Sequence, residues 1–265
     1  MPKKLNLRAL SERKACGEEL IRRIIRRVKA RVVGESPQLD YRQCLFQDLV
    51  GYLGGRRVRR ALEIGPKDGA DTRRLLTLEP ERLVLVDLPR LEESNRVWLQ
   101  QVNSPKIEYI SGNLMYSKLV TMLEPFDLVW CTGVLYHNPE QLRMVRRLYD
   151  LLIPGGVLVL ESATTRRQQF RRENCVEIIY PPSEEMKKKY HLSLNITHLP
   201  SARAISSWLS MVGFERITPS PCHTRVSMRL ARARAAYLAT KPLDPKPGTY
   251  YSFAGEDGYE IGNAL

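Results

Sequence analysis

The stretch of sequence that decides the fold is residues 60–69, Arg-Ala-Leu-Glu-Ile-Gly-Pro-Lys-Asp-Gly, in which an apolar run leads through a glycine turn into a helical pattern. Glycines in such a turn let a ligand approach the backbone closely. The spacing is Glu-x-Gly-x-x-x-Gly, and Pro66 removes an amide that a diphosphate would need at the helix start. Because Glu63 also adds negative charge, the turn favours a cofactor with an amino acid and a sulfonium over a dinucleotide.

Apolar runs and helical patterns alternate around this turn. The runs lie at residues 60–64, 83–87, 107–110, 127–132 and 156–161, the helical patterns at 69–78, 91–101, 117–123 and 139–152, and after a polar stretch a helix follows at 201–212 with strands near 214–218 and 233–240. Such alternation predicts a mostly parallel sheet with helices on both faces and ligands at the carboxyl ends of its strands. We therefore expect an α/β fold, a doubly wound, Rossmann-like sheet of seven strands with an N-terminal helical extension and an insertion after the fifth strand.

Composition divides the chain into three parts. Residues 1–57 form the N-terminal extension, which holds a basic amphipathic helix and a second helix at 39–53. Residues 58–242 hold the sheet, interrupted by the charged, proline-bearing segment 165–200, which we interpret as an insertion or lid. Residues 243–265 form a tail rich in proline, glycine, tyrosine and acidic residues.

The positive charge of the 265-residue chain, +13 in total, is concentrated at its start. Residues 1–33 hold eleven Lys and Arg against three Glu, while apolar residues from Leu20 to Val32 recur at helical spacing. Either the apolar stripe of this helix packs against the body of the protein with its arginines in solvent, or the helix contacts RNA or a membrane surface.

Several classes of protein are excluded by the sequence. No run of about 18 apolar residues occurs, so no transmembrane segment is predicted, and the start lacks the apolar core of a secretory signal. The five cysteines are scattered, with none at zinc-ligand or redox-pair spacing, which indicates a reduced, cytoplasmic protein. His191 and His198 stand too far apart for a one-turn metal pair, and no metal site is predicted.

Polar side chains end the strands that follow the glycine turn. Asp87 lies about 20 residues beyond the first glycine, where a carboxylate accepts hydrogen bonds from both hydroxyls of a ribose. Asn113 follows the third strand, where an amide can bind the edge of an adenine while Leu88 and Leu114 pack against the ring faces. The fourth strand ends in residues 131–133, Cys-Thr-Gly.

Taken in this order, the strand ends resemble those of the class I S-adenosylmethionine (SAM)-dependent methyltransferases, over residues 58–241. The resemblance implies that the first-strand loop binds the methionine part of SAM, that the aspartate binds the ribose, and that the end of the fourth strand lines the floor near the sulfonium. The cofactor-binding residues that it implies are Glu63, Gly65, Pro66, Lys67, Gly69, Asp87, Leu88, Asn113, Leu114, Cys131, Thr132 and Gly133.

A nearer resemblance, to the tRNA wobble-uridine carboxymethyltransferase family, rests on the runs 133–137, 199–215 and 234–242. In that family a tyrosine and a C-terminal arginine contact the carboxylate of a carboxylated SAM. They match Tyr136 and Arg234, which the resemblance therefore implies as substrate-binding residues. A lysine upstream of the first strand also helps there. Here no lysine occurs between Lys29 and Lys67, and Arg42 is its possible substitute, so SAM is the favoured cofactor over its carboxylated form.

Two residues after the fourth strand are candidates for catalysis. Methyl transfer from a sulfonium is an in-line displacement in which the protein holds the acceptor and sometimes removes a proton. His137 is the candidate general base, because an imidazole titrates near neutral pH; the alternative is that it caps the helix that Asn138 and Pro139 begin. Tyr136 either contacts the acceptor or packs beneath the insertion.

The sequence thus predicts a SAM-dependent methyltransferase that acts on a small-molecule or glycan-type acceptor. Two alternatives stay open: a tRNA wobble-uridine-modifying enzyme, with tRNA bound through the basic N-terminal helix, and a non-catalytic SAM-binding module. The sequence specifies no oligomeric state.

Overall fold

The computed structural model describes residues 40–180, 183–185 and 197–246. The basic helix predicted within residues 1–33, most of the predicted tail and His191 lie outside this part of the chain. The bounds of the second predicted helix are close to those found, since α2 spans Tyr41–Leu53.

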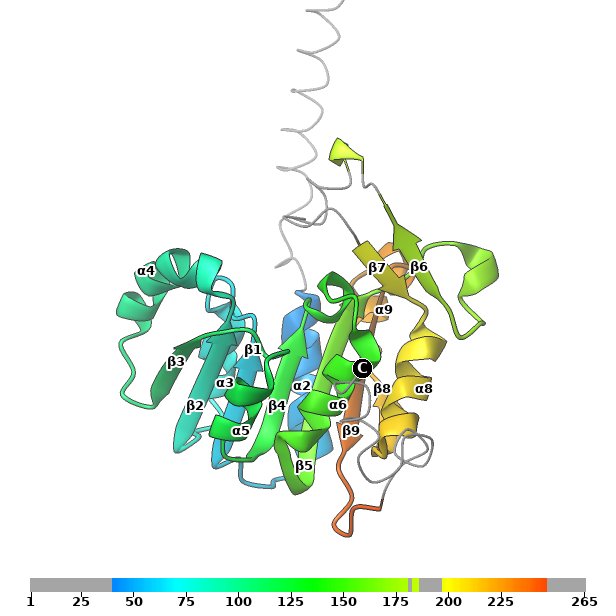
Figure 1. Cartoon of the computed structure of the whole chain (residues 1–265). Helices are drawn as coiled ribbons and strands as arrows, with labels where there is room; N and C mark the ends of the chain where they lie inside the picture. The colour runs from blue at the N-terminus through cyan, green and yellow to red at the C-terminus, as the bar shows by residue number, and fades with distance from the viewer. Residues whose placement is uncertain (1–39, 181–182, 186–196, 247–265) are drawn as a thin grey trace, which may run out of the picture. The chain divides into compact units, whose positions relative to one another are not determined.

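The core of the described chain is a seven-stranded sheet with the strand order β3-β2-β1-β4-β5-β9-β8 (Figure 1). All neighbouring strands are parallel except β9, which runs antiparallel to both β5 and β8. This order confirms the predicted doubly wound, mostly parallel sheet. The strands are β1 (Arg60–Ile64), β2 (Arg82–Asp87), β3 (Ile107–Ser111), β4 (Phe126–Thr132), β5 (Leu152–Ala163), β8 (Glu215–Pro219) and β9 (Arg234–Thr240).

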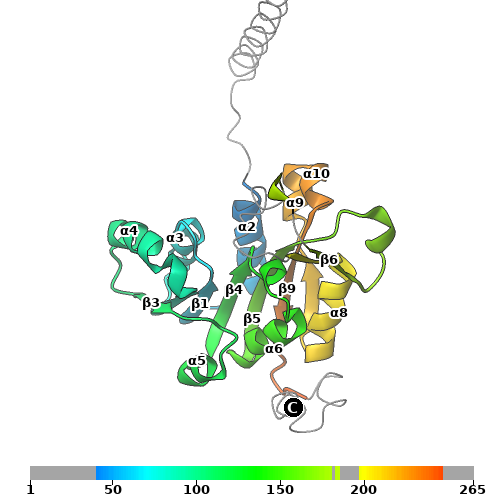
Figure 2. The same ribbon diagram turned by 45° about the horizontal axis from the view of Figure 1, so that its top comes forward.

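Helices cover both faces of this sheet because its buried strands are apolar on both sides. One face packs against α5 (Ser117–Met122), α6 (Gln141–Asp150) and α8 (Ala202–Val212), and the other against α2, α3 (Ala70–Leu76) and α4 (Glu92–Val102). Figure 2 shows α5 and α6 on one side of the sheet and α3 and α4 on the other. No helix in the described ranges is long and apolar enough to cross a bilayer.

The insertion after β5 contains more regular structure than the sequence indicates. A separate two-stranded antiparallel sheet is formed by β6 (Val176–Ile179) and β7 (Thr197–Pro200).

Two short helices, α9 (Cys222–Val226) and α10 (Met228–Ala231), follow β8. The strands β6 and β7 and the helices α9 and α10 were not predicted, because segments of four or five residues are too short to show a hydrophobic period.

The start of α6 corrects one prediction. The sequence placed Asn138 at the N-cap and Pro139 in the first turn of this helix, but the helix begins at Gln141. Asn138 instead ends the short 3₁₀ helix η2 (Leu135–His137), and its Oδ1 accepts a hydrogen bond from the amide of Glu140 at 2.8 Å. The side-chain oxygen of Asn138 therefore stabilises the turn between η2 and α6, a role that Asn commonly takes in turns.

Candidate cofactor and acceptor site

The glycine turn between β1 and α3 has a left-handed backbone at alternate residues. Gly65, Lys67 and Gly69 have φ values of 70°, 54° and 71°. A Cβ at Gly65 would lie 2.8 Å from Cγ2 of Val134, and one at Gly69 would lie 2.3 Å from Cε3 of Trp98. Both glycines are therefore required by the backbone and by the packing of Val134 and Trp98 against the turn.

Glu63, at the end of β1, is buried with its carboxyl group next to α3. The hydroxyl of Thr72 donates to Oε2 of Glu63 at 2.6 Å. Burial raises the pKa of Glu63 to about 8, although the hydrogen bond from Thr72 acts in the other direction. The carboxyl group is therefore largely protonated at neutral pH, and a cationic ligand beside it would favour its ionised form.

Asp87 ends β2 and is held in place by α4. Its Oδ1 accepts from the amide of Leu88 at 2.8 Å, and its Oδ2 accepts from Nδ2 of Asn95 at 2.9 Å. Nε1 of Trp98 donates in turn to Oδ1 of Asn95 at 3.2 Å. Burial raises the pKa of Asp87. Each carboxylate oxygen retains capacity for one more donor, which is what two ribose hydroxyls supply.

The predicted adenine and floor residues lie in different surroundings. Oδ1 of Asn113 accepts a hydrogen bond from the backbone amide of Met115 at 2.9 Å. The side-chain nitrogen, Nδ2 of Asn113, is then the group that can donate to a ligand. Leu114 and Cys131 are buried in the core of the sheet, and burial raises the pKa of the Cys131 thiol. Thr132 is also buried and donates to Asp71. Gly133, the residue that follows β4, lines a cavity.

A cavity of about 310 Å³ opens at Gly133, at the carboxyl ends of β1 and β4. Four cationic residues line it, and no acidic residue does. They are Arg42 of α2, Lys67 of the glycine turn, Arg166 after β5, and Arg234 at the start of β9. We call this the basic cavity. An anionic group is the ligand that such a lining attracts.

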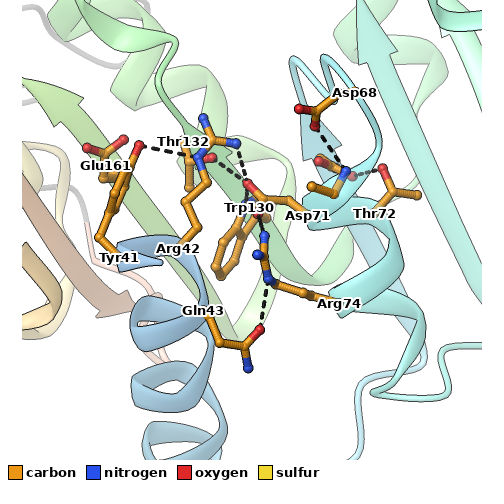
Figure 3. Close-up of polar contacts among 12 residues, drawn as sticks. Tyr41, Arg42, Gln43, Asp68, Asp71, Thr72, Arg74, Trp130, Thr132 and Glu161 are labelled. Atoms are coloured by element: carbon orange, nitrogen blue, oxygen red, sulfur yellow. Dashed lines mark hydrogen bonds and ion pairs between the residues drawn. The ribbon is translucent and has the colours of Figure 1, made fainter. Parts of the chain in front are cut away.

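Arg42 is fixed at the basic cavity by a buried carboxylate (Figure 3). Nη1 of Arg42 donates to Oδ2 of Asp71 at 2.7 Å, and the Asp71 side chain is only 1% exposed. The other donors to Asp71 come from its own helix and from β4: Arg74 at 2.6 Å, Thr132 at 3.0 Å and Trp130 at 3.1 Å. The second nitrogen, Nη2 of Arg42, lies 3.1 Å from where a Cβ at Gly133 would stand.

Arg234 reaches the same point from the other side of Gly133. Nη2 of Arg234 donates to Oε2 of Glu161 at 2.9 Å, and Nε donates to Oε1. Glu161 is fully buried in β5 and also contacts Nε2 of His223 at 3.1 Å. Burial alone would raise the pKa of Glu161, but the charge of Arg234 and these hydrogen bonds outweigh it and lower the pKa to about 2.

Aromatic side chains complete the wall around Arg234. Its guanidinium carbon lies 5.6 Å from the ring centroid of Tyr41 and 5.7 Å from that of Tyr136. Tyr136 stacks in turn on His137, with centroids 4.1 Å apart. Both predicted catalytic residues, Tyr136 and His137, therefore line the basic cavity together with Arg234. No cluster of three metal-ligating side chains occurs among the residues that the model describes.

A family model described as a methyltransferase domain matches residues 39–218, which is more than half of the chain. The chain belongs to this methyltransferase family. The predicted resemblance to the class I SAM-dependent methyltransferases is thereby confirmed, as is the predicted class of fold.

Curated relatives of this methyltransferase domain carry the name tRNA U34 carboxymethyltransferase. The protein from Chromohalobacter salexigens is 26% identical over 210 residues, covering 77% of this chain and 59% of the relative. The protein from Vibrio parahaemolyticus is 39% identical over 95 residues, covering 36% of this chain and 26% of the relative. The match thus spans less than two thirds of the length of these curated relatives.

Solved structures show the same fold at low identity. The N-methyltransferase NodS from Bradyrhizobium japonicum, in complex with S-adenosylhomocysteine (SAH), has a TM-score of 0.53 and 19% identity, covering 78% of this chain and 89% of that chain. The 1,6-didemethyltoxoflavin-N1-methyltransferase from Burkholderia thailandensis has a TM-score of 0.52 and 14% identity, covering 91% of this chain and 92% of that chain.

Four residues that organise the site were not predicted. Asp71 and Glu161 hold the two arginines of the basic cavity, Asn95 holds Asp87, and His223 contacts Glu161. Glu161 carried a signal, because it is a charged residue in the apolar run 156–161. Asp71 and Asn95 carried none, since acidic and amide residues are ordinary in the first turns of exposed helices.

Proposed function

We propose that the chain is a SAM-dependent methyltransferase whose reaction takes place in the basic cavity. The observation that carries the proposal is the convergence of Gly133 and the glycine turn on one cavity at the carboxyl ends of parallel strands. Family membership supports it. SAM supplies the electrophilic methyl carbon, and the chain's own residues bind the cofactor, orient the acceptor and exclude water.

The residues around the turn fit such a cofactor. Gly65 and Gly69 have left-handed backbones, and Lys67 between them lines the basic cavity, which places the turn beside the proposed ligand. Glu63 lies beneath the turn as a carboxyl group that responds to a nearby cation. Asp87, fixed by Asn95, is placed to accept hydrogen bonds from two hydroxyls of a ribose.

The charge of the basic cavity bears on the acceptor. A sulfonium beside Arg42 and Arg234 would add a further positive charge to a cationic lining. The molecule that reacts there therefore carries negative charge, because opposite charge restores the electrostatic balance. We propose a small-molecule or glycan-type acceptor bearing a carboxylate or phosphate, with His137 as the general base and Tyr136 beside the acceptor.

A second candidate function is carboxymethyl transfer to a tRNA wobble uridine. Arg42 is the observation that favours it, because the chain lacks the upstream lysine of that family and Arg42 reaches the cavity instead. Nη2 atoms of Arg42 and Arg234 lie 3.1 and 3.8 Å from the position of a Cβ at Gly133, so both can bind one carboxylate there. The names of the curated relatives support this reading.

Calorimetry tests the cofactor assignment. We expect the wild type to bind SAH at micromolar strength, and Asp87→Ala to weaken binding by about 100-fold, since two charge-assisted hydrogen bonds are lost. Glu108→Gln, at the opposite end of the sheet, is the matched control and leaves the affinity unchanged. Absence of any heat from the wild type with SAM and with SAH rejects the proposal.

Mass spectrometry separates the two candidate functions. The small molecule released from the purified, denatured protein is SAM or SAH under the first candidate and a carboxylated SAM under the second. The second also requires tRNA affinity that falls steeply as salt is raised. A variant without residues 1–33 tests the predicted role of the basic N-terminal helix in that affinity.

A further inference from the structure

Lys67 occupies a backbone conformation that a lysine adopts at a cost. Three residues of the turn, Gly65, Lys67 and Gly69, are left-handed, and glycine fills two of these positions. In the left-handed region the Cβ of any other residue comes too close to the following carbonyl oxygen, a penalty that glycine avoids. A residue held in such a conformation at a binding site points to a role for its side chain.

Left-handed backbone alone does not mark a function, as Glu79 shows. Glu79 has φ of 53°, nearly that of Lys67, and is an exposed residue in the turn before β2 that lines neither of the two cavities described. Lys67 differs because it lines the basic cavity, as do Arg42 and Arg234. The two positions therefore share the backbone penalty and differ in their access to a ligand.

The charge of Lys67 is also less compensated than that of its neighbours. Arg42 and Arg234 are each paired with a buried carboxylate, Asp71 and Glu161. No carboxylate of a described residue pairs with Lys67. Asp68, which follows Lys67, accepts from the amide of Ala70 at 3.1 Å instead. The ammonium of Lys67 is thus available to an anionic ligand.

We propose that Lys67 is a specificity-determining residue that binds an oxyanion of the molecule in the basic cavity. The inference rests on the proposed function, because it takes the reacting molecule to be the occupant of that cavity. The oxyanion has two possible sources: the amino-acid carboxylate of the cofactor, or a carboxylate on the transferred group. Both are oxygen anions that an ammonium binds as a point charge.

Replacement of Lys67 by glycine separates the backbone penalty from the binding role. Lys67→Gly removes both the strain and the charge, whereas the control Glu79→Gly removes strain of the same kind outside the cavity. We expect each variant to raise the Tm by about 2 °C. Only Lys67→Gly should weaken oxyanion binding, by about tenfold. Lys67→Arg, which keeps the charge, should stay within about threefold of the wild type.

Three probe ligands identify the source of the oxyanion. SAH carries the amino-acid carboxylate, 5′-methylthioadenosine lacks it, and a carboxylated SAM carries a second carboxylate on the transferred group. If Lys67→Gly weakens SAH and spares methylthioadenosine, Lys67 binds the amino-acid carboxylate. If it spares SAH and weakens the carboxylated SAM, Lys67 binds the transferred group.

Unchanged affinity of Lys67→Gly for all three ligands overturns the inference while the proposed function stands. A wild type that binds none of them overturns both. A Tm that falls in Lys67→Gly but rises in Glu79→Gly also counts against the inference, because it would give Lys67 a structural role in the fold.

Discussion

The two ends of the sheet each carry a cavity with arginines, and they use carboxylates in opposite ways. At the amino end, a cavity of about 380 Å³ is lined by Arg82, Glu108 and Glu124. Arg82 pairs with both acids, whose side chains are 41% and 66% exposed. At the carboxyl end, the side chains of Asp71 and Glu161 are 1% and 0% exposed behind their arginines.

The difference shows that the burial of the carboxylate side chain determines whether the cavity presents a cationic or a neutralised surface. An acid beside its arginine in solvent cancels the positive charge and adds little stability. An acid buried behind its arginine fixes the guanidinium and leaves the cationic face toward the ligand. Such an arrangement costs desolvation energy, and removal of the acid leaves a poorly solvated cation without a partner.

Glu161→Gln should break the carboxyl-end arrangement most severely. The change leaves Arg234 without its counter-charge and should lower the free energy of unfolding by about 3–5 kcal/mol at pH 7. Urea unfolding measures the loss. Glu108→Gln, which breaks an exposed pair, is the control.

The pH dependence of the same variant gives an independent check. The pKa of Glu161 is about 2 in the folded protein and 4.5 as its ordinary value, so its stabilisation is complete above pH 4.5. The stabilisation is lost as the pH falls from there toward 2. Glu161→Gln should lack this acid-dependent loss. A parallel decline of both proteins below pH 4.5 would contradict the role given to Glu161.

Glu63 extends the comparison to a buried carboxyl group whose hydrogen-bond donor is the hydroxyl of Thr72 and not an arginine. Its pKa of about 8 lies above the ordinary 4.5, so the unfolded chain ionises first and stability falls as pH rises between these values. Glu63→Gln should remove a decline of about 1 kcal/mol per pH unit over this range. Urea unfolding at pH 5, 6, 7 and 8 measures it, and equal slopes for variant and wild type would refute the assignment.

Asp71→Asn tests how Arg42 is positioned. The variant loses the charge that accepts four hydrogen bonds, and we expect the free energy of unfolding to fall by about 2 kcal/mol. Binding of anionic ligands should weaken as well, because Arg42 loses its fixed orientation. Arg74→Ala is the matched control, since Arg74 bonds to Asp71 but does not line the basic cavity. Equal loss of affinity in both variants would remove Arg42 from the account.

Arg82→Ala should have the smallest effect of the set. Its partners are exposed, so the free energy of unfolding should change by about 0.5 kcal/mol or less. Affinity for SAH should be unchanged, because the residue lies at the opposite end of the sheet. A loss above about 2 kcal/mol would remove the contrast between the two ends.

The sequence predicts the strands and the residues that line the basic cavity well, but it does not predict the carboxylates that hold the two arginines. The strands, the glycine turn and the placement of Tyr136, His137 and Arg234 at one cavity follow from local patterns and from resemblance. The pairs that hold the arginines are not local: Arg42 and Asp71 are 29 residues apart, and Glu161 and Arg234 are 73 apart. Hydrophobic periodicity reports the face that a residue occupies and carries no information on which buried ions will meet.

The wrong prediction for the start of α6 has a physical reason of the same kind. Asn138 and Pro139 match a helix start in residue type, yet η2 uses Asn138 for a turn and delays the helix to Gln141. Gln141 then donates to the carbonyl oxygen of His198 at 2.9 Å, which ties this turn to β7 of the insertion. This contact joins residues 57 positions apart, so a local pattern at residues 138–141 carries no information on it.

The position of β9 has a consequence for how the protein is made. β9 inserts between β5 and β8, and its first residue is Arg234. During synthesis on the ribosome, β8 therefore emerges before the strand through which it joins the sheet. Arg234, the residue that β9 supplies to the basic cavity, takes its place only when the last described strand has left the exit tunnel. Until then Glu161 lacks the guanidinium of Arg234 as its counter-ion, and the basic cavity lacks one of its cationic residues.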